Sequence, residues 1–142
     1  MAFWKFEIRA KRPIPNVPQE LKSIGDHIRK RRVELQLLQK EVATRLKVCE
    51  ESVTLWETNR SKPMIHHMPS IISFLGYLPI EVDDSTLGGK IKRYRLLNGL
   101  SHKKLGRRLT VDASTIASWE KYMRCPDKTN LSRLKKLLNT SG

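Results

Sequence analysis

Apolar positions along this chain recur every three or four residues, which is the spacing of helices and not the alternation of strands. Ile24 and Ile28 fall on one helical face with polar residues opposite, and so do Val42 and Leu46 further along. Such spacing is typical of short amphipathic helices that bury one face. The pattern predicts an all-α protein built from several short helices.

The ends of these helices are also marked in the sequence. Ser23, followed three residues later by Asp26, forms the pair of a capping box that starts a helix. The first helical stretch breaks near Gln36, and Gly99 stands at the corresponding break further along, where glycine commonly ends a helix. We therefore expect a helix that begins after Ser23 and ends near Gln36, with shorter helices after it.

The chain contains an internal repeat. Displacing the sequence by 63 residues lays residues 24–63 on residues 87–126 without a gap, and eleven of the 40 positions are identical. The identical pairs are Gly25/Gly88, Ile28/Ile91, Arg32/Arg95, Leu37/Leu100, Lys40/Lys103, Arg45/Arg108, Leu46/Leu109, Val48/Val111, Trp56/Trp119, Glu57/Glu120 and Pro63/Pro126. The apolar match continues to the pair Leu75 and Leu138. Two copies of one unit account for this agreement.

The repeat divides the chain into four predicted parts. Residues 1–20 form a basic, proline-containing N-terminal arm, residues 21–79 the first domain, residues 80–86 an acidic linker and residues 87–142 the second domain. Each domain is expected to hold four or five short helices. The two tryptophans of the repeat, Trp56 and Trp119, are interpreted as core residues.

Within each copy, two short helices are joined by a three-residue turn, which is the pattern of a helix-turn-helix. The stretches LLQKEVATRLKVCEESVTLWETNRSKP and LSHKKLGRRLTVDASTIASWEKYMRCP resemble Cro/repressor-type (XRE-like) helix-turn-helix domains. The resemblance implies an all-α fold of two small lambda-repressor-like domains in tandem. It also implies binding to duplex DNA.

The two copies depart from the family pattern at identifiable positions. Leu38 stands where the family often has a helix-capping Ser or Thr, whereas Ser101 keeps it in the second copy. The glycine of the turn is replaced by Lys47 and by Thr110. Both turns are therefore expected to place a non-glycine residue in the left-handed region, at some cost in strain.

The resemblance assigns a set of DNA-contacting residues. The second helix of the motif lies in the major groove, with its first turn at the base edges, while the preceding helix and the exit loop contact phosphates. The predicted set is Gln39, Lys40, Glu50, Glu51, Ser52, Thr54, Asn59, Arg60 and Lys62 in the first copy, and His102, Lys103, Arg107, Ser114, Thr115, Ser118, Tyr122 and Arg124 in the second. Gln39 and His102 would bond a phosphate or brace a base contact.

The charge of the chain supports a polyanionic partner. The formal net charge is +14 and the sequence pI is near 10.2, which attracts DNA, RNA or an anionic membrane. Residues 87–142 carry +11 of this charge and residues 21–79 only +4. We therefore expect the second copy to dominate the salt-sensitive contact with phosphates.

The acidic pair Glu50 and Glu51 admits several interpretations. Carboxylates at the tip of a reading helix repel phosphate unless one of them accepts a bond from a cytosine amino group. They also suit the positive N-terminus of a helix without any DNA contact. A third alternative is that the first copy is mainly an interaction module.

The arm also has two interpretations. Phe3, Trp4 and Phe6 stand among cations, so the arm enters a minor groove or straps across a domain or a partner chain.

No other chemistry emerges from the sequence. Cys49 and Cys125 are not spaced as a metal pair, and His66 and His67 have no further ligands nearby, so neither a disulfide, a metal site nor a cofactor is expected. No constellation of catalytic residues is recognisable, and an enzyme is not expected. The sequence has no transmembrane run and no signal-peptide pattern, so a cytoplasmic, nucleoid-associated protein is expected.

The sequence thus predicts sequence-specific binding of double-stranded DNA, as in a transcriptional regulator that acts by operator occupancy. Two linked copies would form a covalent pseudo-dimer on an asymmetric site. The alternative is a protein-interaction module, an antitoxin or adaptor, that uses one copy for a protein partner. A homodimer also remains open.

Overall fold

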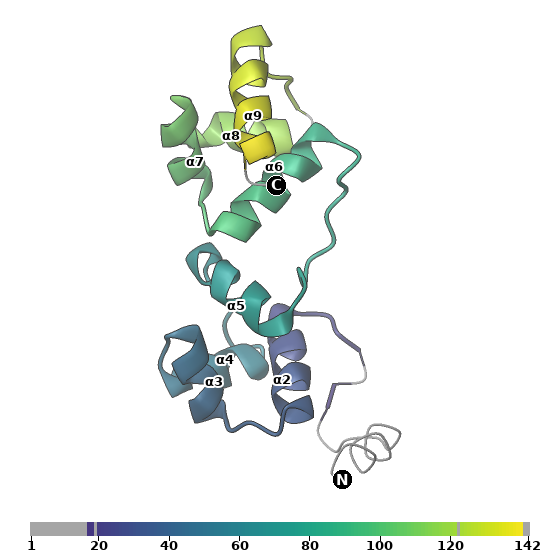
Figure 1. The fold of residues 1–142 in the computed structure, drawn as a ribbon, viewed down its shortest axis with the longest axis vertical. Helices are drawn as coiled ribbons and strands as arrows, with labels where there is room; N and C mark the ends of the chain where they lie inside the picture. The colour runs from purple at the N-terminus through teal and green to yellow at the C-terminus, as the bar shows by residue number, and fades with distance from the viewer. Residues whose placement is uncertain (1–16, 19, 122, 141–142) are drawn as a thin grey trace. The chain divides into compact units, whose positions relative to one another are not determined.

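A computed structural model describes residues 17–140, apart from 19 and 122, and every regular element in that part of the chain is helical (Figure 1). The elements are α2 (Ile24–Glu34), α3 (Gln39–Leu46), α4 (Glu50–Glu57), the 3-10 helix η1 (Ile65–His67), α5 (Met68–Leu75), α6 (Leu87–Asn98), α7 (His102–Leu109), α8 (Ala113–Glu120) and α9 (Lys128–Thr140). The predicted all-α class is confirmed for these residues. None of the described helices combines the length and apolar content needed to cross a membrane. Most of the predicted N-terminal arm lies outside the described residues.

The chain divides into two compact units, Met1–Pro63 and Met64–Gly142. This division falls earlier than residue 79, where the repeat alone would end the first domain, because α5 contacts α6. A side chain at Gly99, the residue that follows α6, would already lie 3.1 Å from Pro69 of α5. The domain ranges 21–79 and 87–142 therefore remain a prediction from the repeat.

The first unit is organised around α2, α3 and α4. Ser23 caps α2 by accepting a hydrogen bond from the amide of Asp26 at 3.1 Å, which confirms the predicted capping box. α2 packs so closely on the end of α4 that a Cβ at Gly25 would lie 1.8 Å from the carbonyl oxygen of Trp56. Trp56 is 4% exposed, in agreement with its predicted place in the core.

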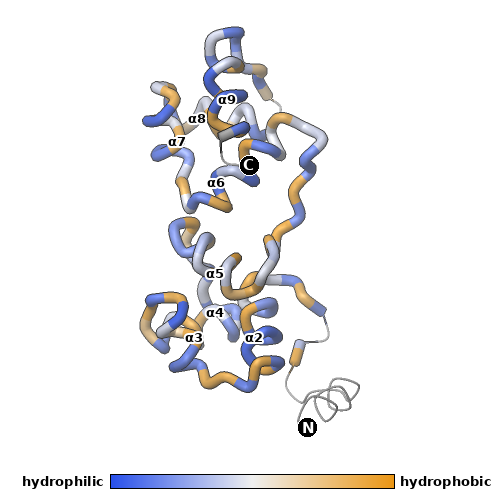
Figure 2. The backbone as a smooth tube through the Cα atoms, in the orientation of Figure 1, coloured by the Kyte–Doolittle hydropathy of each residue, from blue (hydrophilic) through white to orange (hydrophobic). Residues whose placement is uncertain are grey.

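The second unit contains η1, α5 and the four helices α6 to α9. Thr86 caps α6, which ends at Gly99 with a φ of 66°, and Ser101 caps α7. The end of α6 at Gly99 and the cap of α7 at Ser101 agree with the sequence prediction. The buried cluster of this unit consists of Ile91, Tyr94, Leu100, Leu105, Leu109, Ile116, Trp119 and Leu134. Along α6 and α9, apolar and polar positions are interspersed, as expected for short amphipathic helices (Figure 2).

The two units repeat their local geometry. The bounds of α3 and α7, and those of α4 and α8, differ by the same 63 residues as the sequence repeat. The turn after the first helix of each pair is also the same, with Lys47 at a φ of 58° and Thr110 at a φ of 60°. The left-handed conformation expected at both turns is thus confirmed. The last helices differ, since α5 has 8 residues and α9 has 13.

Candidate nucleic-acid interface

The turn between α7 and α8 brings the two helices into close contact. The amide of Val111 donates to the carbonyl oxygen of Gly106 at 2.8 Å, and a Cβ at Gly106 would lie 2.5 Å from the carbonyl oxygen of Val111. The first unit has Ala43 at the position of Gly106, and the amide of Val48 donates to the carbonyl oxygen of Ala43 at 3.0 Å. This tight turn fixes the direction in which the second helix of each pair projects.

The predicted reading residues lie at or near the starts of α4 and α8. Glu50 and Glu51 are exposed in the first turn of α4, and Ser114 is exposed at the second position of α8. The remaining members of this group, which are half-buried, are Ser52, Thr54, Thr115 and Ser118. The first turn of α8 therefore presents small polar groups, whereas that of α4 presents carboxylates.

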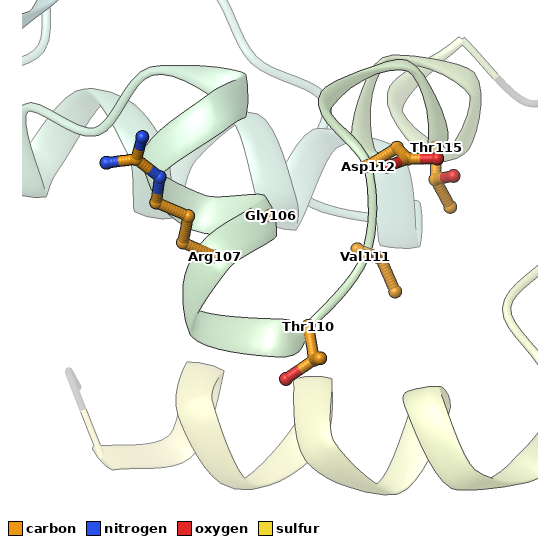
Figure 3. Close-up of a pocket in the computed structure, with 6 residues that line it drawn as sticks. All are labelled: Gly106, Arg107, Thr110, Val111, Asp112 and Thr115. Carbon is orange, nitrogen blue, oxygen red and sulfur yellow. The ribbon is translucent and has the colours of Figure 1, made fainter.

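A shallow pocket lies beside the turn of the second unit. It is lined by Gly106, Arg107, Thr110, Val111, Asp112 and Thr115. Asp112 and Thr115 lie next to each other at the start of α8, and Arg107 extends from α7 away from them (Figure 3). The structure thus brings two predicted DNA-contacting residues, Arg107 and Thr115, to the rim of one depression.

The predicted phosphate-contacting cations are all at the surface. The exposed members are Lys40, Arg60, Lys62, Lys103, Arg107 and Arg124. Tyr122, which was predicted with them, lies outside the described residues. Exposed cations on α7 and on the exit loops leave these positions open to an anionic ligand.

Asn59, for which a phosphate contact is predicted, forms hydrogen bonds within the first unit. It occupies the left-handed region with a φ of 60°. Its Oδ1 accepts from the Ser23 hydroxyl at 2.6 Å, and its Nδ2 donates to Asp26 at 3.3 Å. The side chain of Asn59 therefore joins the exit loop of α4 to the start of α2, and its part in DNA contact remains a prediction.

A buried ion pair connects α2 to the end of α4 in the first unit, and an equivalent pair connects α6 to the end of α8 in the second unit. In the first unit, Arg32 donates to both carboxylate oxygens of Glu57, at 2.7 and 2.8 Å, and to the carbonyl oxygen of Leu37 at 3.1 Å. The Glu57 side chain is only 2% exposed. Two parallel charge-assisted bonds restrict both the distance and the orientation of the helices they join.

The second unit repeats this ion pair. We call each of the two pairs, Arg32–Glu57 and Arg95–Glu120, a clasp. Arg95 donates to Glu120 at 2.6 and 3.1 Å and to the carbonyl oxygen of Leu100 at 3.1 Å. Neither ion pair was assigned from the sequence. The signal that could have found them is that arginine and glutamate are identical in both copies although they are charged.

Gln39 and His102, at the first positions of α3 and α7, are held against these clasps. Gln39 accepts from the Thr54 hydroxyl at 2.9 Å and donates to Glu57 at 3.3 Å. The Nε2 atom of His102 lies 2.6 Å from Glu120. Gln39 thus connects the start of α3 to Thr54 and Glu57 of α4, and its part in DNA contact remains a prediction.

Two titratable groups near the interface are shifted by their neighbours. The hydrogen bond between the Ser52 hydroxyl and the exposed Cys49 thiol lowers the pKa of that thiol. Burial would raise the pKa of Asp26, but bonds from Asn59, Lys22 and Ser23 outweigh it and lower the pKa.

Among the described residues, no three His, Cys, Asp or Glu side chains gather as metal ligands would.

The tight turn and the two packed helices α7 and α8 have the arrangement of a helix-turn-helix. Residues 91–142 match the family model described as Helix-turn-helix. The match supports an XRE-like helix-turn-helix in this part of the chain, of a kind that binds double-stranded DNA. No curated protein and no solved structure matches the sequence.

Proposed function

We propose that this protein binds double-stranded DNA sequence-specifically and regulates transcription by occupying an operator. The observation that supports the proposal most is the combination, in residues 91–142, of the helix-turn-helix match with the exposed Ser114 on the first turn of α8 and exposed cations on α7. Cations contribute affinity, and small hydroxyls at base edges contribute sequence preference. Such a regulator would work in the cytoplasm, on the nucleoid.

The proposal includes the first unit as a second helix-turn-helix. Its support is internal, since α3 and α4 repeat the bounds of α7 and α8 and the Arg32–Glu57 clasp repeats the clasp of Arg95. The protein would then act as a covalent pseudo-dimer.

The two reading helices are not equivalent, so the preferred operator is asymmetric. The first turn of α4 carries Glu50 and Glu51, where α8 carries Ala113 and Ser114. A carboxylate reads a cytosine amino group, whereas a hydroxyl serves as donor or acceptor for any base edge. A perfect palindrome would contradict this part of the proposal.

Selection of binding sites from random duplex DNA, followed by footprinting, tests the proposal. A protected region of about 20 bp or more is expected if both units bind one duplex one turn apart. A footprint of about 10 bp would leave the first unit without a DNA contact, and failure to enrich any sequence would contradict the proposed function itself.

A pair of substitutions tests the reading role of α8. Ser114→Tyr with Thr115→Phe should weaken binding to the selected site by at least about tenfold, because each base-edge contact contributes about 1–3 kcal/mol of discrimination. Binding to unrelated DNA should persist, since the cations of α7 are intact. Competition titrations with selected and scrambled duplexes measure both terms, and an equal loss in both would exclude a base-edge role.

A second candidate function is protein interaction through the first unit. Leu38 is 66% exposed and Leu35 is 38% exposed, whereas the equivalent positions hold Ser101 and Asn98. Exposed apolar side chains can mark a docking surface. A footprint confined to the second unit, together with a protein partner that is lost in Leu35→Asn, Leu38→Ser, would favour an antitoxin or adaptor or a homodimer.

A further inference from the structure

The helices α3 and α7 begin with different side chains, an amide in the first unit and an imidazole in the second. Gln39 and His102 occupy equivalent positions, and both contact the carboxylate of the local clasp, Glu57 or Glu120. An amide keeps its hydrogen-bond donors at every pH, whereas an imidazole gains and loses one of its donors near neutral pH.

The clasp fixes which nitrogen of His102 carries the proton. Glu120 accepts two bonds from Arg95 and, as a carboxylate, has no proton to offer. His102 therefore donates through Nε2 to Glu120 over 2.6 Å. In the neutral imidazole the other nitrogen, Nδ1, is then an acceptor with a lone pair, and it cannot donate to a phosphate oxygen. Only the protonated ring donates at both ends.

We propose that the second unit contacts a DNA phosphate through protonated His102, so that binding takes up one proton and strengthens as the pH falls. This inference rests on the proposed function and adds to it a regulation by pH. The carboxylate of Glu120 lies on one side of the imidazolium and the phosphate on the other. The charged hydrogen bond to the phosphate exists only in the protonated state.

The first unit serves as the pH-independent counterpart. The Oε1 atom of Gln39 accepts from the Thr54 hydroxyl, and its Nε2 donates one hydrogen to Glu57. The second hydrogen of the same amide nitrogen remains for a phosphate at any pH. The position of Thr54 is taken by Ala117 in the second unit, so His102 has no hydroxyl of this kind to bind it.

The charged neighbours of His102 lie on several helices. The charged groups that face it from the neighbouring helices are Glu120 of α8 and, through this carboxylate, Arg95 of α6. On α7 itself the nearest cations, Lys103 and Lys104, are exposed, and Arg133 of α9 bonds to the opposite end of α7 at Leu109. The His102 side chain is 39% exposed, which allows exchange with solvent.

The affinity of the full chain for its selected duplex, measured from about pH 5.5 to about pH 8.5, tests the inference in the range where imidazole titrates. Wild-type protein should lose about tenfold to a hundredfold across this range at constant ionic strength, since one charge-assisted hydrogen bond is lost. The slope should not exceed about tenfold per pH unit, the limit for one proton.

The matched variant is His102→Gln, which places in the second unit the residue that the first unit already uses. It should bind with a much flatter pH profile, because Gln keeps its donors. The other titratable groups of the chain are common to both proteins, so the difference between the profiles reports His102 alone. The reverse variant, Gln39→His, should steepen the profile if the first unit also contacts phosphate.

The outcomes separate this inference from the proposed function. Parallel profiles for wild-type protein and His102→Gln, with sequence-specific binding retained in both, would overturn the role of His102 and leave the function standing. Absence of sequence-specific binding in wild-type protein at every pH would overturn the proposed function first. Circular dichroism of each variant establishes that it is folded at the pH of each measurement.

Discussion

Charged residues inside the two units act as structural elements at the residue scale. Glu57 and Arg95 are 4% and 7% exposed, and each belongs to one of the two ion pairs. In both pairs the arginine donates two bonds to the carboxylate and one to a backbone carbonyl oxygen. A buried ion pair stabilises little against an apolar alternative, but the removal of one partner leaves the other charge uncompensated. Each arginine therefore needs its glutamate partner to keep the two helices in place.

Substitution of Glu57 by Ala should lower the free energy of unfolding by about 3–5 kcal/mol, because the Arg32 guanidinium loses its buried partner. Chemical denaturation followed by tryptophan fluorescence measures the change, since Trp56 is buried beside Glu57. The control is Glu20→Gln, which removes an ion pair to Lys22 whose side chains are 73% and 80% exposed. That pair should contribute less than about 1 kcal/mol, and equal losses in the two variants would contradict the structural role of the clasp.

At the scale of elements, the ends of the helices position the interface. The capping box of α2 is joined to the exit loop of α4 through Asn59, so the start of one helix and the end of another are fixed together. Asp26 belongs to the capping box and also bonds to Asn59. Its carboxylate accepts from the amides of Lys22 and Ser23 at 3.0 and 3.2 Å. The ionised carboxylate accepts these bonds more strongly than the protonated acid would.

The first unit should therefore lose stability in acid through Asp26. The folded protein holds the pKa of Asp26 below its ordinary value of 3.8, so the stabilisation is complete well above that value and is lost as the pH falls through the lowered pKa. Thermal unfolding as a function of pH measures this loss. Asp26→Asn should be less stable near neutral pH and show a weaker acid dependence, and an unchanged dependence would exclude Asp26 as its source.

Charge is distributed unevenly over the whole molecule. The range 87–142 carries +11 and the range 21–79 carries +4, while the segment between them contributes −3. Part of this acidic segment has a local role, because Asp84 pairs with Arg93 of α6 at 3.1 Å and Asp83 binds the amide of Ser85. Within residues 87–142 the cations outnumber the carboxylates by 14 to 3, which favours contact with a polyanion.

Replacing Lys103 and Arg107 by Gln should reduce the dependence of DNA affinity on salt. The slope of log affinity against log salt should fall by about 0.9 for each phosphate contact that is lost. Titrations of a labelled duplex at several salt concentrations give the slope. Lys90→Gln with Lys92→Gln, two exposed changes on α6, serve as the control, and an equal decrease in both double variants would show that general charge, not position, sets the slope.

Much of the fold follows from local signals in the sequence. The start of α2, the end of α6 at Gly99 and the cap of α7 at Ser101 were all predicted, because capping and helix termination depend on residues within one turn of each other. The 63-residue displacement predicted which helices would share their bounds. Trp56 and Trp119 were predicted as core residues from helical spacing alone.

Contacts between distant residues were decided only by the tertiary structure. The ion pairs Arg32–Glu57 and Arg95–Glu120 each join residues 25 positions apart, and the grouping of α5 with α6 depends on how helices pack. The same holds for the 2.6 Å contact between the Nε2 atom of His102 and Glu120. Periodicity and capping are encoded within a few residues, whereas the pairing of charges across helices depends on the positions of both helices in the folded unit.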